Sequence, residues 1–283
     1  DRKERRMGME FGAEQALKAM REDPKTAELV EAYALGVNDY INQLDDKDIP
    51  VEYKLLDYKP EQWSSKKTAL LLMLMTKDLA SSDNDLERTN ALRIFGKEKF
   101  DFLFPDYLND GEPVIPEDTD WSFIDVPMTE TPVSEMVMDS ISMVIEKPDP
   151  DNGSNNWAVS GAKSYSGNPI LANDPHLSLS LPSIWFVMQL STPEHNAFGA
   201  TLPGALGVIS GFNNHISWGE TNARRDLVDW YKIEFDKNDP SKYKHDEQWK
   251  DVSFRIEEIK IRGGMTFKDT VRYTHHGPVT YDS

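Results

Sequence analysis

Ser154, in the stretch DNGSNNWAVSG at residues 151–161, is the first residue whose setting suggests chemistry. Gly153 precedes it at the end of PDPDNG (148–153), whose prolines, acids and Asn-Gly pair are typical of an exposed loop. A serine hydroxyl is a weak nucleophile and needs a base to react. Two inert interpretations compete: an ordinary turn, and the N-x-[ST] glycosylation pattern at residues 152–154. Local sequence alone favours the turn.

Three further groups of polar residues have side chains that could serve a site. They are His176 in ANDPHLSL, the acids of DLVD (226–229), and the pair His275-His276. Each also has a simple structural interpretation: a turn histidine, solvated acids on a strand edge, and a turn with two exposed imidazoles. The histidine pair would need a third ligand to hold a metal ion.

Composition limits the classes of function. The chain has 283 residues, 39% of them hydrophobic, which suits a globular protein of roughly two domains. A formal charge of −18 argues against nucleic acid and anionic membrane surfaces as partners, and it is compatible with divalent cations. The absence of cysteine excludes disulfides, zinc–thiolate sites and a cysteine nucleophile.

Neither a membrane span nor a signal peptide is expected. The longest apolar run, ALLLMLM at 69–75, is far shorter than the roughly 18 residues that a span needs. The chain opens within a helical pattern and without an initiator methionine, so we expect a trimmed start.

The first half of the chain has helical patterns. Asp23 and Pro24 predict the start of a helix that continues to about residue 44. A second helix is expected from Ser64 through residues 69–75, buried nearly all round, and a third over 84–96, ending at Gly96. Residues 101–131 read as an irregular surface segment, and residues 132–147 could form a further helix.

After Ser154 the pattern changes to short strands separated by turn residues. We therefore divide the chain into a mostly helical region (1–147), a linker (148–153) and a mainly β region (154–283). Alternation in RIEEIKIR predicts a strand with one wet face. The expected strands lie within 156–161, 168–174, 183–191, 196–204, 206–213, 215–222, 228–236, 254–263 and 267–279.

Six motifs follow one another along residues 153–279: GSNNWAVSG, PILANDPHL, PSIWFVMQL, GATLPGALGVISGFNNHISWGETN, DLVDWY and HHGPV. Together, in this order, they resemble the penicillin acylase family of N-terminal nucleophile hydrolases. Segments 22–41 and 51–63 resemble the α-chain of that family, so the likeness covers almost the whole sequence. It implies an α+β fold, part of an αββα sandwich in which antiparallel sheets pack against helices of the α-chain region.

The resemblance implies a precursor that cuts itself between Gly153 and Ser154 to give an α-chain/β-chain heterodimer. Ser154 would then be nucleophile and, through its new α-amine with a reference pKa of about 7.7–8.0, general base. His176 would orient these groups by hydrogen bonding. Backbone N–H groups of Asn222 or the adjacent Ala223 would stabilise the oxyanion. A second donor of the family falls beyond residue 283.

The family's calcium motif matches Asp226, Val228 and Asp229, whose oxygens suit Ca²⁺. Strict alignment places Ser82 where the family has an acidic ligand in its α-chain. Asp83 or Asp85 would have to supply the missing carboxylate instead. No organic cofactor is expected. The acyl pocket would include Trp185, Phe186 and Phe212, although ordinary core aromatics are an equal interpretation.

The predicted function is hydrolysis of an acyl amide of a small molecule, in an exported protein of the periplasm or the medium. The alternatives are an unprocessed, inactive fragment or homologue of the same fold, and a non-enzymatic β-domain that binds carbohydrate or peptide. We expect the fragment alone to be inactive, because the family's site extends beyond this sequence.

Overall fold

The structure is a computed structural model that describes residues 2–80, 85–105, 118–120, 122, 153–177, 179–222 and 227–280. The chain forms two compact units. The larger comprises the described parts of 1–81, 148–225 and 233–283, and the smaller those of 82–147 and 226–232. The predicted helix over 132–147 and residues 148–152 of the predicted linker lie outside the described residues. Ser82, Asp83, Ala223 and Asp226 lie outside them too.

Helices occupy the described part of the first half of the chain, as predicted. Asp23 begins the longest one by accepting a hydrogen bond from the Thr26 backbone N–H at 2.9 Å, and Pro24 takes its first position. Val30 and Ala34 on its predicted stripe are buried. The helices of the larger unit are α1 (Arg2–Arg6), α2 (Met9–Glu22), α3 (Pro24–Gln43), α4 (Val51–Leu56) and α5 (Ser65–Leu79).

Helix α5 is less buried than its apolar sequence predicts. Thr68, Ala69 and Met75 are buried, and the helix packs on α2 and α3. Leu72 and Leu74, however, are 45% and 44% exposed. Successive residues of a helix point in directions about 100° apart, so packing on one side covers only one face. The prediction of burial all round is therefore wrong for the described structure.

The smaller unit contains α6 (Asp85–Phe95) and α7 (Lys97–Leu103). Gly96 ends α6 as predicted, with φ of 72°. It also lies directly before α7, so the segment predicted to be irregular from residue 101 begins inside a helix. The rings of Phe100 and Phe104, whose centroids are 5.0 Å apart, pack together at the end of α7.

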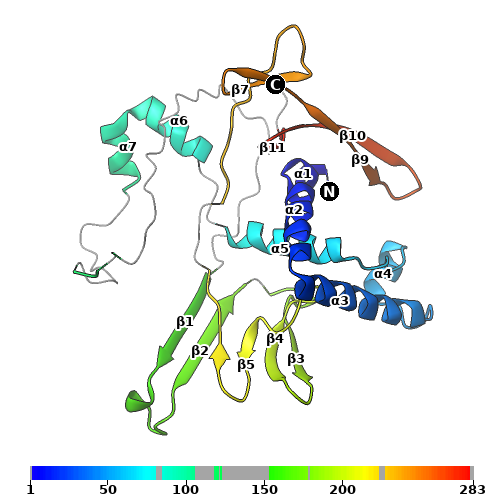
Figure 1. Ribbon diagram of the computed structural model, residues 1–283, viewed down its shortest axis with the longest axis vertical. Coiled ribbons are helices and arrows are strands. Elements are labelled where there is room, and N and C mark those ends of the chain that lie inside the picture. Colours follow the sequence, from blue (N-terminus) through cyan, green and yellow to red (C-terminus); the bar gives the residue numbers. More distant parts are fainter. Residues whose placement is uncertain are drawn as a thin grey trace. The chain divides into compact units, whose positions relative to one another are not determined.

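The second half of the described chain is built of antiparallel strands, so the α+β assignment is confirmed (Figure 1). Gly153 lies in the first strand, β1 (Gly153–Val159), which pairs with β2 (Ile170–His176). Strands β3 (Phe186–Ser191), β4 (Asn196–Thr201), β5 (Ser210–Phe212) and β6 (Ser217–Trp218) form a four-stranded sheet in that order. The remaining strands are β7 (Lys242–His245) with β8 (Gln248–Asp251), and β9 (Ser253–Lys260), β10 (Thr266–Thr274) and β11 (Gly277–Pro278).

One predicted strand is wrong and one hairpin is unpredicted. Within 228–236 the structure has only an isolated bridge, between Phe235 and Tyr243. The β7–β8 hairpin turns instead at Asp246 and Glu247, whose φ angles are 49° and 59°. Two positive φ angles are what a tight hairpin turn requires, and the usual sequence signal for them is Asn-Gly or Asp-Gly.

Charged side chains lie on the covered face of β9 and β10. Glu257 and Asp269 pair across the two strands, and each residue is only 6% exposed. Arg5 Nη1 lies 2.7 Å from Glu257 Oε2, and Arg6 contacts both carboxylate oxygens of Asp269 at 2.7 and 2.8 Å. The Arg6 guanidinium holds the pKa of the Asp269 carboxyl well below its usual range. Helix α1, which has no buried residue, is thus bound to the sheet by ion pairs.

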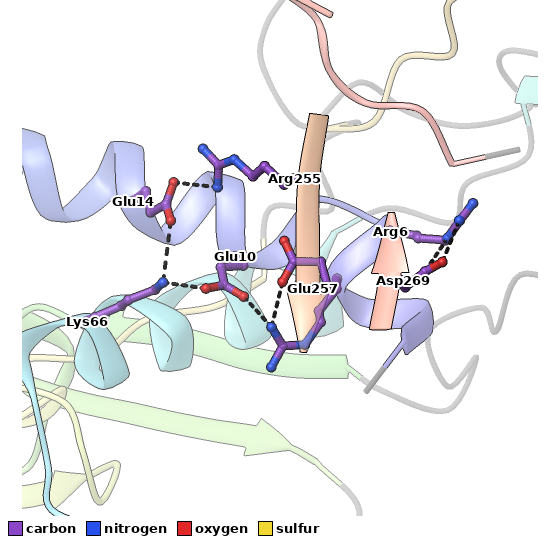
Figure 2. Close-up of polar contacts among 8 residues, drawn as sticks. Arg6, Glu10, Glu14, Lys66, Arg255, Glu257 and Asp269 are labelled. Carbon is purple, nitrogen blue, oxygen red and sulfur yellow. Dashed lines mark hydrogen bonds and ion pairs between the residues drawn. The ribbon is translucent and has the colours of Figure 1, made fainter. Parts of the chain in front are cut away.

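The ion pairs continue along α2 to α5. The Glu14 carboxylate forms ion pairs with Arg255 of β9 at 2.8 Å and with Lys66 of α5 at 3.4 Å (Figure 2). The Glu10 carboxylate contacts both Lys66 and Arg5. The predicted alternation of β9 is confirmed, since the exposed residues Phe254 and Ile256 alternate with the half-buried Arg255 and the buried Glu257. The face turned toward the helices is the charged one, because arginines and a lysine compensate its carboxylates.

Candidate active site

The register of β1 and β2 determines the surroundings of Ser154. Ser154 lies opposite Pro175, and Gly153 lies opposite His176. Residues directly opposite in an antiparallel pair share a face, and side chains alternate between faces. Ser154 therefore shares its face with Pro175, whereas His176 extends from the other face of the ribbon. A Cβ atom built on Gly153 would lie 3.7 Å from His176 Nδ1.

His176 contacts an acid rather than the serine hydroxyl. Its Nε2 lies 2.8 Å from Asp174 Oδ2, and both side chains are exposed. Ser154 is half-buried, and no residue in the described ranges hydrogen-bonds to its hydroxyl. The structure thus brings His176 beside Gly153, on one side of the bond predicted to be cut, and leaves the Ser154 hydroxyl on the other face.

Two asparagines on the Ser154 face fasten the segment that follows β6. Asn156 Nδ2 donates to the Gly219 carbonyl at 2.6 Å, and Asn173 Nδ2 donates to the Glu220 carbonyl at 2.8 Å. A Cβ on Gly219 would lie 2.5 Å from Asn173 Cβ, so this approach requires glycine. The contacts anchor the chain just before Asn222, the predicted oxyanion donor, which is half-buried.

A cavity of about 540 Å³ opens on the same face of β2. Pro175, the residue opposite Ser154, is part of its wall. Of the three predicted pocket aromatics, Trp185 and Phe212 line the cavity and Phe186 does not. The Trp185 indole N–H is buried and has no hydrogen-bond partner among the described residues. The other lining residues are Leu171, Asn173, Ala200, Ser210, Gly211, Ser217 and Trp218.

The residues proposed for calcium are only partly described. Val228 is half-buried and Asp229 exposed, in a segment without regular secondary structure. The smaller unit contains both this segment and Asp85, at the start of α6, so the two stretches that the resemblance assigns to the metal fall in one compact unit. Oxygen donors of these types suit Ca²⁺.

A cluster of three histidines is the feature that sequence reasoning missed. His275 and His276 form the predicted turn, between β10 and β11, and both are exposed. His245, at the end of β7, lies beside them. No spacing rule links His245 to this pair, because only the fold brings β7 to the β10–β11 turn.

Comparison with known proteins decides the family. The model of the penicillin amidase family matches residues 1–283. The chain belongs to the penicillin amidase family. This membership confirms the family predicted from the ordered motifs, and it agrees with the predicted fold class.

Named relatives of this amidase-family chain are acylases. The acyl-homoserine lactone acylase QuiP of Pseudomonas aeruginosa is 28% identical over 264 residues, which cover 90% of this chain and 30% of that protein. Penicillin acylase 2 proenzyme of Pseudomonas sp. (strain SE83) is 26% identical over 284 residues, covering 97% and 35%. The chain thus spans about a third of the length of these relatives.

Among solved structures, the thermostable penicillin G acylase of Alcaligenes faecalis is similar, with a TM-score of 0.42 and 25% sequence identity. The similarity covers 47% of this chain and 23% of that one. Among the described residues of the amidase-family chain, no helix is long and apolar enough to cross a membrane.

Proposed function

We propose that this protein hydrolyses acyl amides and that Ser154, freed as the first residue of a β-chain, is the nucleophile. The observation that carries the proposal is the position of Ser154 on β1. It lies opposite Pro175 in the cavity wall and on the strand face that carries Asn156 and Asn173, which anchor the segment leading to Asn222. Membership of the penicillin amidase family supports the reaction class.

The chemistry needs one prior step at Gly153. Attack of the Ser154 hydroxyl on the Gly153 carbonyl, followed by hydrolysis of the resulting ester, would leave an α-amine on Ser154. That amine titrates near neutral pH, where a general base is most effective, and it belongs to the same residue as the hydroxyl it serves. Gly153 has no side chain to shield its carbonyl from attack.

The catalytic cycle then follows acyl transfer. The amine of Ser154, directly or through a water molecule, takes the hydroxyl proton as the oxygen attacks the substrate carbonyl. The backbone N–H of Asn222 or Ala223 would stabilise the tetrahedral oxyanion, a contribution that typically amounts to about 10²–10³ in rate. The amine product leaves with a proton, and water releases the acid. His176, held by Asp174, acts as a positioning residue beside Gly153.

The cavity suits the acyl part of the substrate. Its volume lies in the range of small-molecule sites, roughly 300–1,000 Å³. Its wall combines Leu171, Trp185, Phe212 and Trp218 with a few polar groups, so it favours an apolar acyl chain or ring. The names of the relatives, an acyl-homoserine lactone acylase and a penicillin acylase, are compatible with such a group.

Calcium and export belong to the same proposal. Asp226, the Val228 carbonyl and Asp229 would hold Ca²⁺ together with an acid near α6, Asp83 or Asp85 in place of the residue at Ser82. The ion would stabilise the smaller unit. The processed protein would be an α/β heterodimer in the periplasm or the medium.

The test uses the full-length protein and its Ser154→Ala variant. Intact mass and N-terminal sequencing should find a β-chain that begins Ser-Asn-Asn-Trp, and hydrolysis of acyl-homoserine lactones and penicillins should be measured in parallel. Ser154→Ala should remain uncut and inactive, while Ser191→Ala, at the exposed end of β3, should behave as the parent does. An uncut parent that is inactive would favour the unprocessed alternative, and a Ser154→Ala variant that still cuts itself and hydrolyses substrate would refute the mechanism.

A further inference from the structure

Three histidines from two hairpins meet on the larger unit, apart from the residues assigned to acyl transfer. His245 is the last residue of β7, and His275 and His276 form the turn between β10 and β11. Each offers a ring nitrogen, and the three nitrogens lie within 4.8 Å of one another. The centroid of the His275 ring lies 3.9 Å from that of His245 and 3.8 Å from that of His276.

We propose that His245, His275 and His276 form a binding site for a divalent transition-metal ion, Zn²⁺ in particular. Imidazole nitrogens suit Zn²⁺, whereas Ca²⁺ and Mg²⁺ prefer oxygen ligands. Three protein ligands with an open fourth position are a common zinc arrangement. The site is therefore distinct in chemistry from the calcium motif at 226–229.

Hydrogen bonds to the second ring nitrogens support this assignment. His275 Nδ1 lies 3.0 Å from the hydroxyl of Tyr243, which also accepts the His275 backbone N–H at 3.2 Å. Tyr243 is buried, so it fixes the His275 ring and leaves its Nε2 for a metal. His245 Nε2 lies 3.1 Å from Asp246 Oδ2, so Nδ1 of His245 is the nitrogen left to bind a metal. Metal-binding histidines usually have such partners, because these set the orientation and basicity of the ring.

The geometry is close to that of a bound ion but more open. Zinc–nitrogen bonds of about 2.0–2.1 Å in a tetrahedron place the ligand nitrogens about 3.4 Å apart. Side-chain rotations would have to bring the nitrogens closer from separations of up to 4.8 Å. His275 and His276 are exposed and have room for this adjustment, and a water molecule could take the fourth position.

The charges around the cluster act in both directions. Lys250 repels a cation, and Asp246 offsets it. A bound ion would join the β7–β8 hairpin to the β10–β11 turn, so it would also stabilise this part of the larger unit.

The test is Zn²⁺ titration of the full-length protein, produced without a polyhistidine tag and freed of metal by a chelator. Calorimetry should detect a Zn²⁺ site that His245→Gln and His276→Gln each weaken by at least about tenfold, an effect on the scale seen when metal-site residues are changed. His195→Gln and His215→Gln change exposed histidines elsewhere and should leave the affinity unaltered. Circular dichroism confirms that each variant is folded.

A second readout identifies the ligands. Co²⁺ in place of Zn²⁺ should give the visible absorption of a four-coordinate nitrogen site, and His276→Gln should abolish it. Tyr243→Phe should weaken binding without changing its stoichiometry. Zinc binding that survives His245→Gln and His276→Gln, or that His195→Gln weakens equally, would overturn the proposal. So would a folded parent protein that binds no Zn²⁺. Ser154→Ala should bind Zn²⁺ normally, so failure here is distinguishable from failure of the acylase proposal.

Discussion

The ion pair between Asp269 and Arg6 offers the sharpest test of how the larger unit is held together. The change is Asp269→Asn, which keeps the shape of the side chain and removes its charge. In the parent, Asp269 accepts two contacts from Arg6, at 2.7 and 2.8 Å, and two from Arg2, at 3.0 and 3.4 Å. The side chains of Asp269 and Arg6 are only 7% and 12% exposed.

The expected cost follows from this burial. Removing one partner of a buried pair costs about 3–5 kcal/mol, because the remaining charge stays desolvated and loses that partner. Arg2 is more than half exposed and stays hydrated, so the loss of Asp269 costs it little. We therefore expect the lower end of this range, a decrease of about 3 kcal/mol in the free energy of unfolding. Urea denaturation followed by circular dichroism at pH 7 measures it.

A pair on the same strands provides the control. Lys268 and Glu258 are 2.8 Å apart, but their side chains are 64% and 59% exposed. Lys268→Ala should therefore cost less than about 1 kcal/mol. If Asp269→Asn costs no more than Lys268→Ala, the carboxylate does not bind α1 to the sheet, and our reasoning is wrong.

The pH dependence has a definite sign. The pKa of Asp269 is lowered in the folded protein, so its contribution is complete above the unfolded pKa of about 3.9 and is lost as pH falls toward the folded pKa. The stability difference between the parent and Asp269→Asn should be constant from about pH 7 to pH 5 and should shrink near pH 3.

Three further changes test local features. Asp23→Ala removes the cap of α3 and should lower the free energy of unfolding by about 1 kcal/mol in urea denaturation, whereas an unchanged midpoint would show that the Thr26 contact contributes nothing. Gly36→Ala, in the same helix with open space around its Cβ, should raise that free energy by up to about 1 kcal/mol, and a loss would contradict the helical geometry. Gly219→Ala should displace the segment before Asn222 and lower kcat/KM of the full-length protein roughly 100-fold while circular dichroism stays unchanged; unaltered hydrolysis would separate this segment from catalysis.

Local sequence rules predicted the elements whose signals lie within a few residues. Asp23 and Pro24 predicted the start of α3, Gly96 marked the end of α6, and the period-two pattern of RIEEIKIR predicted β9. The β7–β8 hairpin was not predicted, because Asp246 and Glu247 adopt positive φ angles without the Gly that normally signals such a turn. The exposure of Leu72 on α5 was not predicted, because an apolar sequence indicates that a helix packs against a neighbour but not which of its faces the neighbour covers.

The candidate site was predictable in part for the same reason. The ordered motifs predicted Ser154, His176 and Asn222 as site residues, and two of the three predicted pocket aromatics line the cavity. The motifs could not give the register that sets Ser154 and His176 on opposite faces, because register is a property of the pairing. Nor could they give the anchoring by Asn156 and Asn173, or the meeting of His245 with His275, since these contacts join distant segments.

Three of the ion pairs of Figure 2 connect residues that lie on opposite sides of the Gly153–Ser154 bond. Arg5, Arg6 and Glu14 come from one side, and Glu257 and Asp269 are among their partners on the other. Severing the backbone at that bond would consequently leave two polypeptides held together in part by ion pairs, and concentrated salt would weaken the more exposed of these contacts. Halves produced independently should recombine on mixing, faster in dilute buffer than in brine.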